Sequence, residues 1–428
     1  MKKTFCKFAR LILATEGRPV LWLYLILPFF WVNPTLAADC SRVRTYKEVL
    51  SCTLANHPGV LRADAERIRT ERLELKAAQR PNLEFTGKAL KSLTESAQSN
   101  GEMALSYTFE LGGKRAARIE RARREGEIGK IDLEGARNEA LLRTLLALQR
   151  IKSFKAEGDL IDEGIGTFEK ILKTFRTRLR LSPEQDVSMG VFSLALEDYK
   201  INRSQLSSEM AALVKTLELQ TGAKIEVSDA LFPPIQSTWP DMGTGTSGHG
   251  QYRPSNIRLT EMSLNIADAE KGLAKSEAWP DLKLGPDYEW GQGPLSNEKS
   301  LGFTLTLPLP IWNRNQGGIA VAEAEATKAR LSLSLAEKEL EIEKASWLIK
   351  YETGVRAIKE GISSEEMRKR HQKLKKQFTS GLVPSSLVIE ANRQILEFTK
   401  SKNEQELSTL EALWNLKRLM GKLEEEAQ

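Results

Sequence analysis

The chain carries the same order of segments twice, roughly 200 residues apart, and this duplication limits the folds open to it. The stretch KAAQRPNLEF begins at residue 76, and KSEAWPDLKL begins at residue 275. In both, a segment rich in Ala, Lys and Glu stops at a proline, and a strand-like segment follows. Any fold for this chain must therefore contain two structurally similar halves.

Each half contains two segments with alternating apolar residues. Residues 301–309 read LGFTLTLPL, with an apolar side chain at every second position. Because successive side chains of a strand point to opposite faces, this pattern predicts a strand with one apolar face. The same reasoning predicts strands over 83–92, 103–111, 281–290 and 300–310.

Long helices are predicted after the second strand of each half. Residues 114–181 and 315–383 contain no proline. Returning helices are predicted over 184–222 and 385–422, after turns that contain Pro183 and Pro384. The predicted unit is helix, strand, strand, long helix, helix.

Small residues form a stripe along each long helix, in the same register. The stripe consists of Ala122, Gly126, Gly129, Leu133, Ala136 and Ala140 in the first half, and of Ala322, Ala326, Ala329, Leu333, Ala336 and Leu340 in the second. Alternating steps of four and three residues are typical of a left-handed coiled coil, and small side chains permit close helix packing. An ordinary amphipathic helix in a bundle would also fit this stripe.

The predicted fold is thus mostly α-helical with four strands. The first repeat covers residues 38–235 and the second covers 256–428. Residues 236–255, rich in Gly, Pro, Ser and Thr, are predicted to be the linker between them.

The N-terminus resembles a secretory signal peptide over residues 1–37. Basic residues precede the apolar run VLWLYLILPFFWV at 20–32, which is shorter than the roughly 20 residues that a transmembrane helix needs. Thr35 and Ala37 have the spacing of a cleavage site before Ala38. A buried apolar helix is the alternative. This segment also carries five basic residues and one acidic residue, so the net charge of +6 gives no argument for nucleic acid as a partner.

Cleavage would leave two cysteines, Cys40 and Cys52. In an exported chain this pair suggests a disulfide. Lipidation of Cys40 and two unrelated thiols are the alternatives.

The four strands have the length of strands that cross a bilayer, roughly 9–11 residues. A sheet in a membrane must close, because open edges leave backbone groups unpaired in lipid. The smallest common barrels have about 8 strands, so a chain with four must oligomerise to form one. A soluble sheet on a helical bundle is the alternative.

Two stretches resemble the TolC family of outer-membrane efflux ducts. The segment LTLPLPIWNRNQGGIAVAEAE is similar to the strand-to-helix junction of the CzcC-like branch, which serves heavy-metal export. The matching positions are Pro308, Pro310, Asn313, Arg314, Asn315, Gln316 and Gly317. The segment TYKEVLSCTLANHPGVLRADAE at 45–66 resembles the family's opening helix, with His57-Pro58 at its turn.

This resemblance implies a homotrimer in which the strands form an outer-membrane β-barrel of about 12 strands. The helices would continue the wall as a periplasmic tunnel. Family members dock through their helical turns on a periplasmic adaptor protein, also called a membrane fusion protein, and through it on an inner-membrane pump of the RND type. The expected localisation is the outer membrane, with a large periplasmic part.

The same resemblance assigns roles to the helical turns. The expected adaptor-docking tips are Arg180, Leu181 and Ser182 in the first repeat and Gly381, Leu382 and Val383 in the second. Arg180 departs from the Gly of the second tip. The ducts narrow near the tips, often with acidic side chains, and Asp186 and Glu390 are the pore constriction candidates. A ring of carboxylates would favour cations; two solvated surface carboxylates are the alternative.

Other motifs give no support for an enzyme or a cofactor. GTGTSG at 243–248 matches a dinucleotide-binding pattern, but it lies between prolines in the predicted linker. His57, His249 and His371 have no partner at ligand spacing, so no metal site is predicted. The basic run at 115–124 is predicted to be a solvated helix face, with lipid head groups as a further contact.

The predicted function is an outer-membrane duct that exports heavy-metal cations, without enzymatic activity. One alternative is the same duct serving drug efflux or protein secretion. Another is a soluble periplasmic coiled-coil scaffold.

Overall fold

The structure is a computed structural model. It describes residues 40–91, 99–178, 180–233, 239–242, 252–292, 297–363, 366–367, 369–370, 372–373, 376 and 385–427. Residues from Cys40 onward form one compact unit. The predicted signal segment 1–37 and most of the predicted linker 236–255 lie outside the described residues.

Helices make up most of this unit. They are α1 (Tyr46–Asn56), α2 (Pro58–Glu71), α3 (Leu73–Ala77), α4 (Lys114–Arg176), α5 (Pro183–Thr221), α6 (Ser255–Glu277), α7 (Gln316–Glu360) and α9 (Ser385–Leu419), with short 3-10 turns η1 (Asp229–Leu231) and η3 (Leu423–Ala427). At a rise of 1.5 Å per residue, the 63 residues of α4 span about 95 Å. None of the described helices combines the length and the apolar content that crossing a bilayer requires.

Local chemistry explains where several helices begin. Thr45 and Glu48 form a capping box at the start of α1, and Ser182 and Gln185 form another at the start of α5. His57 ends α1 and caps α2, with its Nδ1 accepting a hydrogen bond from the Gly59 N–H at 3.1 Å. The turn expected at His57-Pro58 is therefore present.

Four strands form one antiparallel sheet in the order β2-β3-β5-β6. They are β2 (Glu84–Lys91), β3 (Ser99–Phe109), β5 (Leu282–Gln292) and β6 (Asn297–Thr306). A second, parallel pair joins β1 (Arg42–Val43) to β4 (Lys224–Ile225). In the four-stranded sheet, β2 and β6 are the outer strands.

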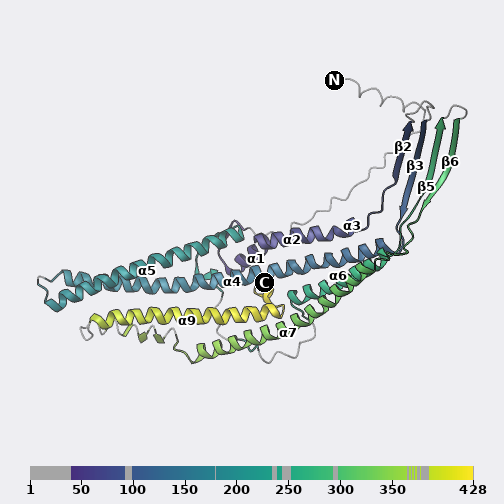
Figure 1. The fold of residues 1–428 in the computed structure, drawn as a ribbon. Helices are drawn as coiled ribbons and strands as arrows, with labels where there is room; N and C mark the ends of the chain where they lie inside the picture. The colour runs from purple at the N-terminus through teal and green to yellow at the C-terminus, as the bar shows by residue number, and fades with distance from the viewer. Residues whose placement is uncertain are drawn as a thin grey trace, which may run out of the picture. The chain divides into compact units, whose positions relative to one another are not determined.

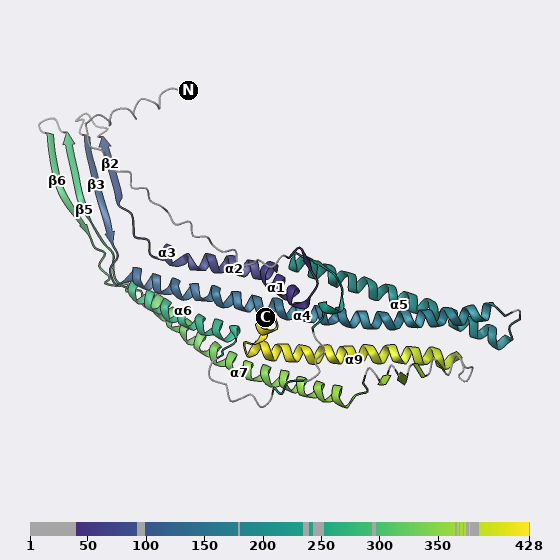
Figure 2. The same cartoon turned by 180° about the vertical axis from the view of Figure 1, so that it is seen from behind.

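The helices follow the order of the strands (Figures 1 and 2). Helix α2 packs on α4, α4 packs on α6, and α6 packs on α7, so α2 and α7 are the outer helices of this layer. The chain runs from α3 into β2, from β3 into α4, from α6 into β5 and from β6 into α7. In the other half of the helical part, α5 packs on α4, α4 on α9, and α9 on α7. The mostly helical fold with two repeats of the predicted order is confirmed.

Several predicted boundaries are wrong for identifiable reasons. Strand β3 begins at Ser99 instead of residue 103, because residues 99–102 pair with β5. Strand β6 ends at Thr306 instead of residue 310, because Pro308 and Pro310 have no N–H to donate to a neighbouring strand.

The long helices also end earlier than predicted. Helix α4 ends at Arg176 instead of residue 181. Helix α7 ends at Glu360 instead of residue 383, because Gly361 adopts extended backbone angles, φ −74° and ψ 163°. Glycine has a low helix propensity, so a helix is readily interrupted there.

Candidate functional site

The four-stranded sheet has one apolar and one polar face. In an antiparallel sheet, directly paired residues lie on the same face. Rows of paired residues such as Phe85–Leu105 and Tyr288–Leu301 belong to the apolar face. The apolar side chains are solvent-exposed in the single chain, as in Phe303 at 64% and Leu301 at 83%. Such a contiguous exposed apolar surface indicates contact with lipid or protein.

Exposed or stacked aromatic residues occur toward both ends of the strands. At the end far from the helices, the rings of Tyr288 and Trp290 stack with centroids 5.9 Å apart. At the helical end, Trp279 and Trp312 are exposed, at 61% and 85%. Aromatic girdles of this kind flank the apolar band of membrane barrels.

The strand-to-helix junction of the second repeat is fixed by side-chain hydrogen bonds. Asn315 has a left-handed φ of 57° and precedes the first residue of α7. Its Nδ2 donates to the Ala274 carbonyl at 2.8 Å, and its N–H donates to Oδ1 of Asn313 at 2.9 Å. The Arg314 Nε donates to the Pro310 carbonyl at 3.1 Å, and the Gln316 Nε2 donates to the Trp312 carbonyl at 3.0 Å. The polar residues predicted at this junction thus close a tight turn and tie it to α6.

The junction of the first repeat uses different residues for the same connection. Gly112 and Gly113 adopt left-handed φ values of 70° and 74°. A β-carbon on Gly112 would lie 2.6 Å from Cβ of Trp279, so glycine is required there. The Arg115 Nε donates to the Ala78 carbonyl at the end of α3, at 2.8 Å, which parallels the Asn315–Ala274 bond. Both repeats therefore tie the long helix to the end of the preceding helix.

Ion pairs hold the junction of the first repeat, and one of them reaches the connection between α6 and β5. Lys114 Nζ lies 2.6 Å from Oδ1 of Asp281, and Arg118 forms two hydrogen bonds with Glu110. The Glu110 carboxylate beside Arg118 raises the pKa of that guanidinium. Sequence reasoning missed these contacts, although the LGGKRAAR stretch contains Lys114, Arg115 and Arg118.

The basic run at 115–124 is partly solvent-exposed, with Arg121, Arg123 and Arg124 between 43% and 58% exposed, and most of its arginines also form ion pairs. Arg121 contacts Glu270 of α6 at 3.1 Å, and Arg123 contacts Glu74 of α3 at 3.5 Å. Opposite charges on neighbouring helices were not visible from the run itself.

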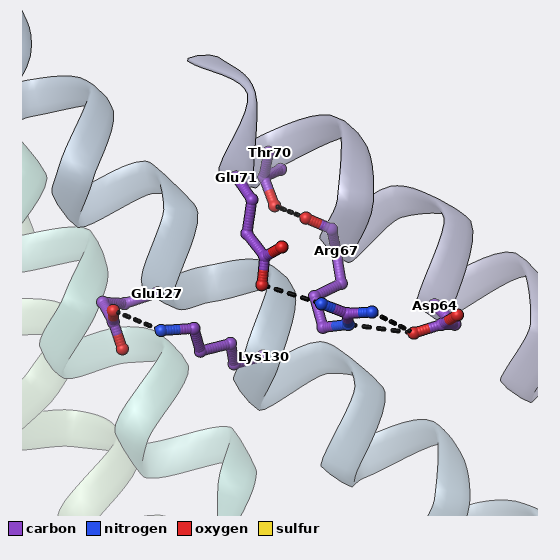
Figure 3. A network of polar contacts seen from close by, with 6 residues as sticks. All are labelled: Asp64, Arg67, Thr70, Glu71, Glu127 and Lys130. Carbon is purple, nitrogen blue, oxygen red and sulfur yellow. Dashed lines mark hydrogen bonds and ion pairs between the residues drawn. The ribbon is translucent and has the colours of Figure 1, made fainter. Parts of the chain in front are cut away.

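The small-residue stripe lies against neighbouring helices, as expected for a seam. Gly126 and Gly129 are buried where α4 contacts α2. Figure 3 shows the polar rim of this contact, where Arg67 bonds both Asp64 and Glu71. In the second repeat, Ala322, Ala326 and Leu340 are the buried members, and Leu340 packs with Ile257 of α6 and Leu419 of α9.

The two outer helices carry apolar stripes that no other described helix covers. On α7 the stripe contains Val321, Leu331, Leu335, Ile342 and Ile349, whose exposure runs from 48% to 69%. On α2 and α3 it contains Leu61, Ile68 and Leu75, each seven residues from the next. Seven-residue steps and alternating steps of four and three are coiled-coil spacing. At both edges, the single chain therefore exposes an apolar stripe with the spacing needed to pack against another helix.

The predicted tips can be placed only in part. Arg180, Leu181 and Ser182 form the turn from α4 into α5, at the end of the helices opposite the sheet (Figure 1). Gly381, Leu382 and Val383 lie outside the described residues.

The two pore constriction candidates have different surroundings. Asp186 is exposed in the first turn of α5. Glu390 accepts hydrogen bonds from Arg393 and from Gln394, both at 2.8 Å, and these bonds lower the pKa of Glu390. Its charge is therefore largely compensated, whereas no described ion pair involves Asp186.

The two cysteines of the compact unit are joined. Cys40 and Cys52 form a disulfide with a Cα–Cα distance of 5.7 Å, which fits ordinary disulfide geometry. The bond ties the segment before β1 to α1.

Within the described ranges, no group of three or more His, Cys, Asp and Glu side chains could hold a metal ion. His57 caps a helix, and burial lowers the pKa of its imidazole. His249 and His371, and the GTGTSG stretch, fall in residues that the structure does not describe.

Comparisons with known proteins support the fold. No protein-family model and no curated protein sequence matches the chain. Among solved structures, the Campylobacter jejuni CmeC outer membrane channel is 14% identical, with a TM-score of 0.68 over 90% of this chain and 89% of that chain. The outer-membrane channel OprN is 14% identical, with a TM-score of 0.69 over 88% and 90%. The open state of the Neisseria gonorrhoeae MtrE outer membrane channel is 15% identical, with a TM-score of 0.61 over 90% of each chain. The chain therefore has the TolC-like fold of these channels, and the similar structures are described as channels, not as enzymes.

Proposed function

We propose that the chain is one subunit of a trimeric outer-membrane duct that exports heavy-metal cations from the cell or the periplasm. In this proposal its tips dock on a periplasmic adaptor, which links it to an RND-type pump. The observation that carries the proposal is the pair of open edges. Strands β2 and β6 have unpaired outer sides, and α2 and α7 carry uncovered apolar stripes along the same two edges.

Edges that differ from each other favour head-to-tail association. When the α7 edge of one copy meets the α2 edge of the next, the contact is heterologous, and it forms a ring if the rotation closes. The same step would pair β6 with β2 of the next copy and remove both edges of the four-stranded sheet. Four strands from each of three copies give about 12 strands, within the range of bacterial barrels. The TolC-like fold is the reason for choosing three copies.

The dimensions of the sheet agree with a bilayer. Strand β5 has 11 residues and would extend about 37 Å. Tilted by about 45°, it would cover about 26 Å of membrane thickness, close to the apolar band of barrels, about 25 Å tall. In this proposal, the aromatic residues toward the two ends of the strands would lie near the head-group boundaries.

The choice of heavy-metal cations as the cargo rests on the junction residues that resemble the CzcC-like branch, Pro308 to Gly317. The alternatives are drug efflux or protein secretion through the same duct, and a soluble periplasmic scaffold. A soluble scaffold would not explain an exposed apolar sheet face flanked by aromatic residues. The duct is therefore better supported than the scaffold.

Two measurements test this proposal. The first is insertion of the purified, detergent-extracted protein into planar lipid bilayers, where a duct gives stable single channels and a scaffold gives none. The second is deletion of the gene, followed by exposure to zinc, cobalt, cadmium, copper and silver salts beside a panel of hydrophobic drugs. Sensitivity to metals alone, restored by the wild-type gene, supports metal export. Sensitivity to drugs alone keeps the duct and rejects the metal cargo.

A further inference from the structure

We infer that the polar face of the sheet makes the distal mouth of the duct selective for cations. This inference rests on the proposed function, because it requires that face to line a pore. It places a selective element in the sheet, at the end far from the helices, in addition to the constriction candidates near the helical tips.

The first observation is how charge is divided between the two faces. The pairing register places five carboxylates and two lysines on the polar face of the four strands. They are Glu84, Glu102, Asp287, Glu289 and Glu298, with Lys88 and Lys283. The apolar face carries only Lys91 and Lys299 within the described strands, both near its distal end. Acidic residues are thus confined to the polar face.

The second observation is which of these charges are compensated. Glu84 and Lys283 form an ion pair with a 2.8 Å separation and cancel each other. Asp287 accepts a hydrogen bond from the Thr304 hydroxyl at 2.9 Å, which leaves its charge in place. No ion pair within the described residues involves Glu102, Glu289 or Glu298, which line a shallow hollow of about 320 Å³ together with Lys88. The distal part of the polar face is therefore net negative.

The third observation is a local arrangement that disfavours the sheet. Glu102 of β3 and Glu289 of β5 are direct partners in the pairing register, and Lys88 of β2 is the direct partner of Glu102 on its other side. Like charges directly opposite each other destabilise a sheet. Departures from local stability are expected where a protein uses the residues for function. If the polar face lines a pore, these two carboxylates would attract permeating cations.

The arrangement favours passage over binding. The carboxylates occupy three successive polar-face rows, and none of the described residues forms a metal-ligand cluster. Rings of acidic side chains select cations by charge, and weak binding lets the ion leave. In a trimer each carboxylate would occur three times around the pore. The substrate class implied is small hydrated cations, without discrimination among metals.

The lysines on the apolar face agree with an orientation in which the polar face lines the lumen and the apolar face contacts lipid. Lys299 shares a row and a face with Trp290. In a membrane this position lies at the boundary, where an ammonium group can contact phosphate-bearing head groups. Acids toward the lumen and lysines toward the lipid are thus consistent with one orientation of the sheet.

The test is the reversal potential of single channels in a KCl gradient, measured on the full-length trimer. Wild type should prefer K⁺ over Cl⁻. The E102Q/E289Q variant should lower this permeability ratio by about twofold or more, and the change should shrink at high salt. Lys88→Gln should raise the ratio. Lys299→Gln is the matched control, because it removes a charge from the neighbouring row on the opposite face, and it should leave the ratio unchanged.

Each outcome is decisive. An unchanged ratio in E102Q/E289Q, or a shift caused by Lys299→Gln, overturns the inference. The double variant removes the like-charge contact and also the carboxylate opposite Lys88, so its trimer content is measured first. If it assembles poorly, Lys88→Gln still tests the direction of the effect, and an unchanged or lower ratio overturns the inference. If wild type forms no channel, the proposed function fails, and this result is distinct from a channel without cation preference.

Discussion

Gly129 of α4 lies so close to Arg67 of α2 that a β-carbon at position 129 would be 2.9 Å from the Arg67 Cα. The neighbouring atom belongs to the backbone, so it cannot move aside as the end of a flexible side chain can. Gly126, one turn earlier, approaches the backbone of Thr70 in the same contact. The small residues of the stripe are therefore what permits α2 to pack this closely on α4.

Gly129→Ala should lower the free energy of unfolding by about 1–3 kcal/mol, because the two helices must separate to admit the methyl group. Gly166→Ala in the same helix is the matched control, since no atom lies within 4 Å of a β-carbon there. The control should stabilise α4 by up to about 1 kcal/mol through its better helix propensity. Thermal melts of both variants in detergent measure the difference. Equal melting temperatures would show that the α2–α4 contact is not tight.

Tyr199 and Tyr351 are both buried, but only Tyr351 satisfies its hydroxyl. Tyr351 donates to the Pro240 carbonyl at 2.6 Å, whereas the Tyr199 hydroxyl has no hydrogen-bond partner among the residues that the structure describes. Tyr351→Phe should therefore cost about 1 kcal/mol, while Tyr199→Phe should be neutral or stabilising. Melting temperatures at pH 7 provide the test. A large loss in Tyr199→Phe would reveal a partner for its hydroxyl in the assembled protein.

The same tyrosines give a prediction for alkaline pH. Burial raises the pKa of Tyr199 and Tyr351 to about 12, from 10.0. Below pH 10 the phenols are neutral in both states, so they add no pH dependence. Between pH 10 and 12 the unfolded chain loses these protons and the folded chain keeps them, so stability should fall by up to about 1.4 kcal/mol per pH unit for each tyrosine. Urea unfolding at pH 9, 10 and 11 would show a shallower fall in Tyr199→Phe than in wild type.

The order of the elements could be predicted from the sequence because two patterns persist over long stretches. These are the two-residue alternation of the strands and the four-three spacing of small residues along the long helices. The prediction failed where a single contact decides a boundary. The end of α7 depends on the backbone at Gly361, and the start of β3 depends on pairing with β5.

For the site, the repeat register identified the seam and the family resemblance identified the second junction, but neither predicted the ion pair between the first junction and the start of β5. Lys114 and Asp281 are 167 residues apart in the chain. The faces of the sheet were predictable strand by strand, whereas the opposition of Glu102 and Glu289 required the pairing register.

The open edge of α7 predicts how assembly can be broken. Leu335→Glu places a charge in the exposed stripe, where the proposed trimer would bury it without a partner, so trimers should be lost or strongly reduced. Ser332→Glu adds the same charge to an exposed position next to the stripe and should leave assembly intact. Size-exclusion chromatography with light scattering in mild detergent measures the oligomer. Trimeric Leu335→Glu would exclude this stripe from the subunit contact.

The disulfide predicts the last result. Opening the Cys40–Cys52 loop by Cys52→Ser should lower stability by about 3 kcal/mol, because the unfolded chain regains the freedom that the bond removes over a sequence separation of 12. The exposed turn ending at Ser182 lies away from this bond, so Ser182→Ala should cost only the loss of a helix cap, about 1 kcal/mol. Alkylation of wild type before and after reduction counts the thiols, and the mass of the N-terminal peptide shows whether Cys40 carries an acyl chain. Two free thiols, or a lipid on Cys40, would contradict the disulfide; an oxidised and unmodified pair would mean that the N-terminal segment is held to α1 by this bond and not by a membrane anchor.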